Sequence, residues 1–433
     1  MSEYKKNSIT LLGSVGLGTG VMIGAGIFAL LGQMAELSGK WFPFIFVVGA
    51  VVTLFSAYSY MKLSEEYPSA GGIGMYLVKE YGSSATAAVG ALMMALSMVI
   101  NQSLVARTFG EYTVQMFSEE GNAIFVAVLG VGLIIFAFAI NMLSNMVIQS
   151  FTIVVSLVKI IGLIAFAAAG YYVVSFVPAL AASDGTYDGP GALGIVAAVA
   201  LSVLAFKGFT TITNSGDEIV SPTVNIKRSI FISIMICLVV YLLIAFAVSS
   251  TLSIEAIIAA RDYALSASAR PAFGQWGVIL TGLLAIVATI TGIIASVFAV
   301  TRMLAMMSDM KLIPNITVDT KLRKQKQMLF YTTAIALLLT IFFDLSRIAS
   351  MGAILYLIMD MMIHYGLVRN LKDKMDFRAP VVWTALVLDA IVLIAFVAYK
   401  LQQDWFVVMI SLVTALLLIA IERWYLNNAA DAA

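Results

Sequence analysis

Apolar runs of about 20 residues recur along the whole chain, and each is long enough to cross roughly 30 Å of hydrocarbon as a helix. Of the 433 residues, 61% are hydrophobic and only 11% are charged, whereas soluble domains are about a quarter charged. Helices satisfy their own backbone hydrogen bonds in lipid. The pattern therefore predicts an all-α polytopic membrane protein. The net charge of +1 lacks the basic footprint of a nucleic-acid-binding protein.

The apolar runs divide the chain into twelve predicted spans. These cover residues 9–37, 41–64, 86–117, 122–143, 149–176, 191–219, 228–250, 273–307, 328–344, 346–369, 380–401 and 404–425. Lys and Arg concentrate before the first span and in every second connection after it. By the positive-inside rule, we expect both termini to be cytoplasmic and the chain to lie in the cell membrane (the inner or plasma membrane).

Two of the predicted spans contain interruptions. Clustered glycines fill residues 16–32, "GLGTGVMIGAGIFALLG", and Lys207-Gly208 stands in the middle of the sixth span. Each glycine weakens a helix by roughly 1 kcal/mol relative to alanine, so we expect local breaks that line a cavity. The first and sixth spans correspond if spans 1–5 and 6–10 are inverted repeats. Matched interruptions then indicate the substrate site of a transporter.

The two breaks would suit the backbone of an α-amino acid. Free amides after the first break would bind a carboxylate, and free carbonyls at the second would bind an ammonium group. The predicted substrate-binding residues are Ile23, Gly24, Ala25, Gly26, Ile27, Asn101, Leu204, Ala205, Phe206, Lys207, Gly208 and Phe209. The alternative for the first span is that its glycines only permit close packing between helices.

Four segments resemble the amino acid–polyamine–organocation (APC) superfamily. They are "GVMIGAGIFALLG" (20–32), "YSYMKLSEEYPSAGGIGMYLVKEYG" (58–82), "AFKGFTTITNSGDEIVSPTVNIKRSI" (205–230) and "VTRMLAMMSDMKLIP" (300–314). The resemblance implies a LeuT-type fold with helices 1 and 6 broken. Its inverted repeats would be residues 1–176 and 177–370, followed by two extra helices and a tail in 371–433. It also implies transport of amino acids or related amines by alternating access.

Lys159 stands near the middle of the fifth span, where a charge is costly. Gln149, Thr152, Ser156 and Lys159 fall within an arc of about 80° at 100° per residue, so this face should point into the bundle. The resemblance implies that the lysine takes the place of a sodium ion and bonds Gly20 in helix 1 and Thr289 in helix 8. Because burial disfavours the charged form of a lysine, we expect Lys159 to exchange a proton during transport. A fixed structural cation is the alternative.

Other polar residues suggest weaker sites. Asp360 and His364 lie one turn apart in the tenth span and are the second candidate for a proton site, with a structural pair as the alternative. Asp389 has no assigned role. By resemblance, the acidic turn at 217–218 closes the inner side together with Arg302. One histidine and one cysteine do not supply a usual set of soft metal ligands, so no metal is expected.

We therefore predict a secondary active transporter of neutral amino acids with broad specificity, which is coupled to protons or at least independent of sodium. Its partners would be a small amino acid, protons and the lipid bilayer, with no cofactor and no nucleic acid. An exchanger or exporter of the same family is the alternative, as is an acidic amino acid transporter if Lys207 faces the cavity. A channel or an intramembrane enzyme would be a different class, and the sequence has no nucleophile–base constellation.

Overall fold

The structure, a computed structural model, describes residues 7–69, 71–117, 122–142, 145–176, 191–310, 312–313 and 324–431. Within these ranges the backbone is helical apart from turns and connections, and the one isolated β-bridge pairs Ile9 with Ile219 in parallel. The prediction of an all-α chain is confirmed.

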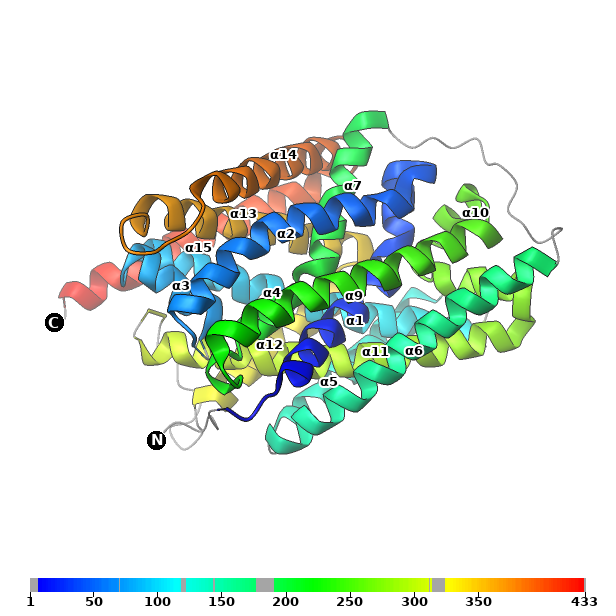
Figure 1. Ribbon diagram of the computed structural model, residues 1–433, viewed down its shortest axis with the longest axis horizontal. Helices are drawn as coiled ribbons and strands as arrows, with labels where there is room; N and C mark the ends of the chain where they lie inside the picture. The colour runs from blue at the N-terminus through cyan, green and yellow to red at the C-terminus, as the bar shows by residue number, and fades with distance from the viewer. Residues whose placement is uncertain are drawn as a thin grey trace.

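The chain forms long helices, and most of them run along the longest axis of the molecule, whereas the helix over residues 191–206 runs across it (Figure 1). They are α1 (Leu11–Ser38), α2 (Phe42–Glu66), α4 (Ala85–Phe117), α5 (Ala123–Asn141), α6 (Asn145–Phe176), α7 (Gly191–Phe206), α9 (Pro222–Thr251), α11 (Ala264–Asp309), α12 (Lys324–Phe342), α13 (Leu345–Asn370), α14 (Ala379–Gln403) and α15 (Trp405–Asp431). Shorter elements connect them: α3 (Gly72–Tyr81), α8 (Thr210–Thr213), α10 (Ile254–Ala259) and the 3-10 turns η1 (Gly39–Trp41), η3 (Lys207–Phe209) and η4 (Gly216–Glu218). Nine helical stretches of the described residues are long and apolar enough to cross a membrane.

Polar side chains define where several helices begin. The hydroxyl of Thr10 accepts a hydrogen bond from Gly13 N at 3.2 Å at the start of α1. Asn122 caps α5 in the same way, with Ile124 N donating at 3.0 Å. A proline occupies the first turn of α2, α9 and α14, where the missing N–H has no intrahelical partner to lose.

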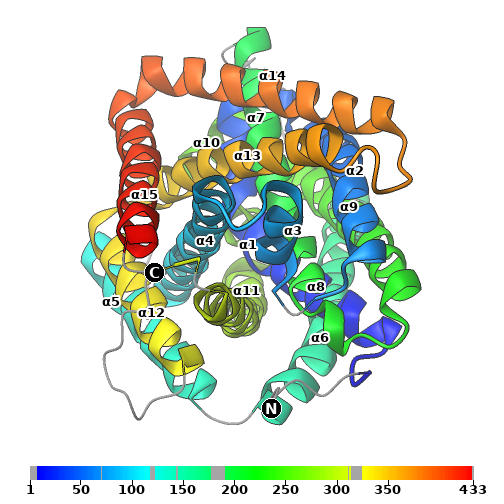
Figure 2. The same cartoon turned by 90° about the vertical axis from the view of Figure 1, so that its left-hand side faces the viewer.

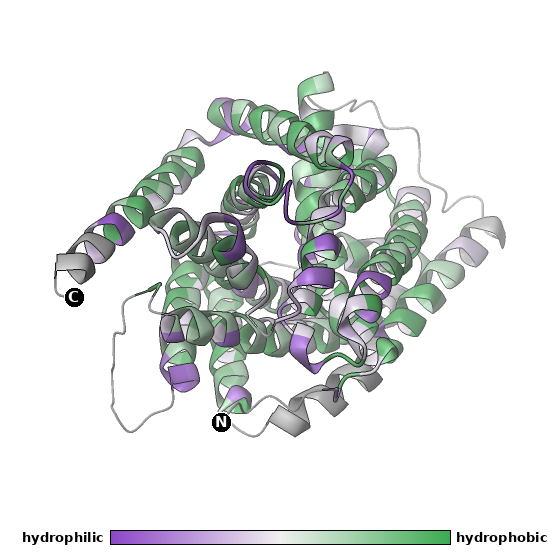
Figure 3. Ribbon diagram, turned by 60° about the vertical axis from the view of Figure 1, so that its left-hand side comes forward, coloured by the Kyte–Doolittle hydropathy of each residue, from purple (hydrophilic) through white to green (hydrophobic). Residues whose placement is uncertain are grey.

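The outside of the bundle is apolar. Large exposed side chains include Phe125 on α5, Ile161 on α6, Ile394 on α14 and Leu412 on α15. Figure 3 shows hydrophobic colouring along most of the length of the helices, with hydrophilic residues mainly near their ends. Exposed apolar patches of this extent mark a surface that is not solvated by water. The chain is therefore a multi-pass membrane protein.

Helix α11 lies inside the bundle and packs against α1, α4, α5, α6 and α12. Figure 2, a view along the helices, shows α1, α4 and α11 surrounded by the other helices. The start of α1 and the end of α15 lie at the same end of the bundle (Figures 1 and 2), here named the terminal end. The connection around α10 lies at the opposite end.

The prediction that helix 1 is broken is wrong in this structure. Helix α1 is continuous from Leu11 to Ser38. The sixth predicted span does change its winding, because α7 ends at Phe206 and the 3-10 turn η3 follows before α8. Both flanking residues of η3 keep right-handed helical backbone angles, so this interruption is a local tightening and the chain keeps its direction.

The glycines of α1 serve close packing, which was the alternative interpretation. A Cβ on Gly24 would lie 3.2 Å from the carbonyl oxygen of Ala288 in α11, and a Cβ on Gly18 would lie 2.7 Å from Ile212 in α8. A Cβ on Gly32 would collide with the backbone of Arg261. Close packing of this kind stabilises helices in membranes and opposes the cost of glycine in a helix, about 1 kcal/mol per residue. The helix therefore stays intact.

Candidate functional site

The predicted substrate residues of the first and sixth spans lie against one another. A Cβ on Gly208 of η3 would lie 2.7 Å from the backbone nitrogen of Met22. A Cβ on Gly26 would collide with the hydroxyl of Tyr241 and lie 3.0 Å from Ala205 Cβ. The middle of α1 and the α7–η3 junction therefore meet at backbone contact distance, and only glycine fits at these two positions.

Tyr241 of α9 joins the two segments. Its hydroxyl donates to the carbonyl of Met22 at 2.7 Å and lies 3.3 Å from the carbonyl of Ala205. Its ring lies 5.1 Å from those of Phe46 and Phe206. Tyr241 was not predicted, although its hydroxyl is the one polar side-chain group in the apolar run "VVYLLIAF" (239–246), a signal that sequence reasoning could have used.

The other predicted substrate residues are buried in the same region. Ile23, Ile27, Phe206 and Phe209 are fully buried, and Leu204 lies close to Gly352 of α13. Asn101 is buried on α4, one turn after Ser97. The side chain of Ala25 lies outside the described residues. The site is therefore closed by side chains in this conformation.

Lys207 points away from α1. Its Nζ donates to the carbonyl of Ser97 at 2.9 Å and to the hydroxyl of the same residue at 2.7 Å. It also lies 5.4 Å from the ring centroid of Tyr356 on α13, within the range of a cation–π contact. The hydroxyl of Ser97 continues to the carbonyl of Gly352 at 3.0 Å. Lys207 thus fixes η3 to α4 and α13.

Lys159 of α6 lies between α1 and α11. Only 1% of the residue is exposed, and its Nζ donates to the carbonyl of Gly20 at 2.9 Å and to the hydroxyl of Thr291 at 2.9 Å. The flanking side chains of Leu157 and Val158 are exposed on the outside of the bundle. The side chains of Gln149, Thr152 and Ser156, which define the predicted polar stripe, lie outside the described residues.

The hydroxyl partner of Lys159 is Thr291, and the choice of Thr289 was wrong. Thr289 donates within its own helix to the carbonyl of Ala285 at 2.7 Å. The choice of Thr289 came from the resemblance to the APC superfamily. Because α11 packs against α1, α4, α5, α6 and α12, residues two positions apart, about 200° around the helix, face different partners and are both buried.

Buried and partly buried ion pairs hold the two ends of the bundle. At the terminal end, Arg302 of α11 forms a bidentate pair with Glu218 of η4, and the bridge between Ile9 and Ile219 ties the start of the chain to the same turn. Asp217, predicted as part of this closure, is partly exposed and has no ion pair among the described residues. At the opposite end, Arg261 pairs with Glu36 at 2.6 Å.

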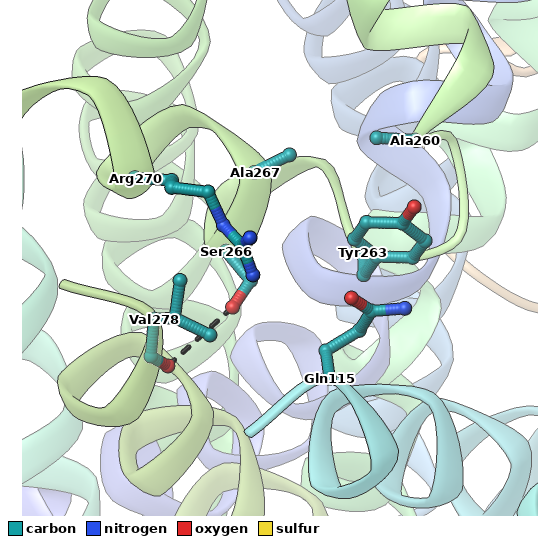
Figure 4. Close-up of a pocket in the computed structure, with 7 residues that line it drawn as sticks. All are labelled: Gln115, Ala260, Tyr263, Ser266, Ala267, Arg270 and Val278. Carbon is teal, nitrogen blue, oxygen red and sulfur yellow. Dashed lines mark hydrogen bonds between the residues drawn. The ribbon is translucent and has the colours of Figure 1, made fainter. Parts of the chain in front are cut away.

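A pocket of about 270 Å³ opens at the end of the bundle opposite the chain termini. Figure 4 shows Tyr263 and Gln115 of α4 next to each other on one side of it, with Ser266 and Arg270 of α11 on the other side. None of the predicted substrate residues lines this pocket. The pocket lies at the end of the bundle near α10 and is separate from the closed site between residues 23–27 and 204–209.

Comparison with known proteins agrees with this architecture. A sequence model of the family described as amino acid permease matches residues 9–427. The inner membrane transport protein YbaT of Escherichia coli is 27% identical over 409 residues, which are 93% of each chain. Protein MJ0609 of Methanocaldococcus jannaschii is 26% identical over 380 residues, 86% of each chain.

A plant relative is more distant. The vacuolar cationic amino acid transporter 2 of Arabidopsis thaliana is 25% identical over 365 residues, which are 80% of this chain and 57% of the relative. The family match spans nearly the whole chain, and the relatives with descriptive names are transporters. The chain therefore belongs to the amino acid permease family of the APC superfamily, and it is a transporter of amino acids or organic cations and not an enzyme.

Proposed function

We propose that this chain is a secondary active transporter of neutral amino acids that works by alternating access, is driven by protons, and needs no sodium. In this proposal Lys159 takes the place of a sodium ion. The observation that carries the proposal is the position of Lys159 Nζ, 2.9 Å from both the Gly20 carbonyl and the Thr291 hydroxyl. One side chain of α6 thereby joins α1 to α11.

The oxygens around Lys159 support this role. A backbone carbonyl and a hydroxyl from two different helices are ligands that a monovalent cation takes in transporters of related architecture. An ammonium group supplies the same charge from within the chain. When it loses its proton, its two charge-assisted hydrogen bonds weaken. The proton on Lys159 then biases the position of α1 relative to α11, as alternating access requires.

The surroundings of Lys207 favour a neutral substrate. An ammonium group at η3, next to the predicted substrate residues, disfavours cationic substrates by repulsion. Its three donors are directed to Ser97 and to the face of Tyr356, away from α1, so it is not positioned to bind an acidic side chain. The substrate would bind where residues 23–27 of α1 meet residues 204–209, and Asn101 of α4 is the third predicted contact.

The proposed topology follows from the same assignment. Residues 1–176 and 177–370 would form the two inverted repeats, and 371–433 would add two helices. Both termini would be cytoplasmic in the cell membrane, because the basic connections lie on their side.

A ligand screen followed by transport tests the substrate class. Thermal unfolding of the purified chain would be measured with each amino acid, since a ligand stabilises the folded state by RT ln(1 + [L]/Kd). We expect several neutral amino acids to stabilise it and to enter proteoliposomes when the outside is acidic. Stabilisation by glutamate alone would contradict the neutral assignment. Uptake that occurs only into liposomes preloaded with amino acid would identify an exchanger.

A further inference from the structure

A second group of buried ionisable side chains lies where α2, α13 and α14 meet. Asp360 and His364 belong to α13 and Asp389 to α14, and all three are fully buried. One side-chain nitrogen of His364 and one carboxylate oxygen of each aspartate lie within 4.8 Å of one another. His364 Nε2 is 3.2 Å from Asp389 Oδ2 and 3.7 Å from Asp360 Oδ1. We name these three residues the acid–histidine cluster.

The two carboxylates have different surroundings. Tyr60 donates to one oxygen of Asp360 at 2.5 Å, and Ser56 donates to the other at 2.6 Å. Neither oxygen of Asp389 accepts a well-formed hydrogen bond from the described residues. The polar atom beside Asp389 Oδ2 is His364 Nε2. Hydrogen bonds to the charged form stabilise a carboxylate. Both oxygens of Asp360 have such donors, whereas those of Asp389 do not.

The orientation of His364 shows what the cluster lacks. Its Nδ1 lies 2.8 Å from the hydroxyl of Ser59, and the opposite nitrogen, Nε2, is buried, has no well-formed hydrogen bond and faces both carboxylates. Without a proton, the lone pair of Nε2 would face two negative groups in a fully buried site. An uncompensated buried charge of this kind is strongly destabilising. A cation has to stand between Nε2 and Asp389.

We propose that the acid–histidine cluster is a proton-binding site in which His364 and Asp389 hold one exchangeable proton and Asp360 is the fixed negative partner. On binding, the proton forms a bond to Asp389 Oδ2 and points toward the lone pair of His364 Nε2, and no other bond changes. A bare proton needs no coordination shell, and the 3.2 Å separation of these two atoms is at the long end of the hydrogen-bond range.

The cluster adjoins the interrupted sixth span. Tyr60, which donates to Asp360, packs its ring edge-to-face at 5.3 Å from Phe209 of η3. Tyr356, one turn before Asp360, lies beside Tyr60 and Ser56 and beneath the Lys207 ammonium. The ionisable groups that face the cluster from the packed elements are thus Tyr60 of α2, Tyr356 of α13 and, beyond it, Lys207 of η3. The cluster is therefore separated from η3 by a single side chain, that of Tyr60.

Infrared spectroscopy of the reconstituted full chain tests this site directly. The carbonyl band of protonated carboxylic acids would be followed as the pH is raised. We expect one component that disappears with pH in the wild type, that is lost in Asp389→Asn, and whose midpoint moves in His364→Gln. Glu422→Gln is the matched control, because Glu422 is a buried carboxyl on α15 outside the cluster, and the Asp389 component should persist in it.

Two results would overturn the proposal. One is that the carboxylic-acid bands, and the pH midpoints at which they disappear, are the same in the wild type, Asp389→Asn and His364→Gln. The other is thermal stabilisation of the wild type by Zn²⁺ that both variants lose, which would make the cluster a metal site. If Asp389→Asn fails to fold, the proposal is tested by His364→Gln alone, through the pH midpoint at which the carboxylic-acid band disappears. Since the titration requires no transport, its failure and the failure of the proposed function are distinguishable.

Discussion

Lys159 and Lys207 are two buried lysines with nearly the same local chemistry and different connections. Each Nζ is bonded to one backbone carbonyl and one hydroxyl at 2.7–2.9 Å, and neither has a carboxylate partner in the described part of the chain. The acceptors of Lys159 come from α1 and α11. Both acceptors of Lys207 belong to Ser97 of α4. Because its two acceptors lie on different helices, Lys159 can control the relative position of α1 and α11. Lys207 instead fixes η3, through Ser97 to α4 and through Tyr356 to α13.

Replacing each lysine separates the two roles most strongly. Two hydrogen bonds to a charged group are together worth about 3–6 kcal/mol, so we expect Lys159→Ala to lower uptake on the order of 100-fold or more and to abolish its pH dependence. Lys207→Met, the matched variant, should lower uptake by less than about tenfold, because the apolar side chain still packs beside Tyr356. Uptake into proteoliposomes at several external pH values measures both. Unchanged pH dependence in Lys159→Ala would contradict the coupling role.

Two threonines of α11 test the geometry around Lys159. Thr291→Val removes the hydroxyl acceptor and leaves the carbonyl of Gly20, so we expect a loss of about 2 kcal/mol and a roughly tenfold lower uptake. Thr289→Val keeps the same volume and removes only a bond within its own helix, so its uptake should change by less than about twofold. Equal effects of the two substitutions would mean that the hydroxyl at 291 has no special role.

Ser97→Ala is expected to have a smaller effect. It removes the hydroxyl that lies 2.7 Å from Lys207 Nζ, while the Ser97 carbonyl remains as an acceptor. We expect a loss of about 1 kcal/mol in the free energy of unfolding, visible as a small decrease in the thermal midpoint, with the pH dependence of uptake retained. A change in that pH dependence would show that Lys207 also takes part in coupling and would remove the contrast with Lys159.

Glu80 of α3 provides a buried carboxyl for comparison with the two lysines. Neither of its oxygens has a hydrogen-bond partner among the described residues, and burial raises the pKa of Glu80 well above its usual value. The folded state then keeps a proton that the unfolded chain releases above about pH 4.3, so the folded state loses stability as the pH rises from there towards the pKa of the folded state. Glu80→Gln should be more stable than the wild type at neutral pH and less sensitive to pH. Thermal unfolding from pH 5 to 8 measures this, and a less stable variant at pH 8 would contradict it.

Much of the fold was predictable because hydrocarbon imposes a simple rule. A polar backbone must be helical in lipid, so apolar length alone located the helices. The position of Gly20 next to Lys159 was also expected, through the resemblance to the APC superfamily. The continuity of α1 was not predicted, because glycine lowers helix stability by an amount that packing against Ala288 and Arg261 can offset, and packing is not visible in a single helix.

The remaining errors have the same origin. Thr291 and Thr289 are both buried, so the polar positions of this helix do not define one face that would distinguish them from sequence. Asp389 had no assigned role because its partner His364 is on another helix, and only the packing of α13 against α14 brings the two together. Tyr241 was missed because its two carbonyl acceptors belong to distant segments.

The most direct test of the central claim is sodium dependence of uptake by the wild-type chain. Uptake of a neutral amino acid found in the ligand screen would be measured into proteoliposomes at fixed external pH, with sodium or with choline as the only other external cation. If the Lys159 ammonium replaces a sodium ion between α1 and α11, the two rates will be equal, and both will increase when the outside is made more acidic. Uptake that requires sodium would contradict the account.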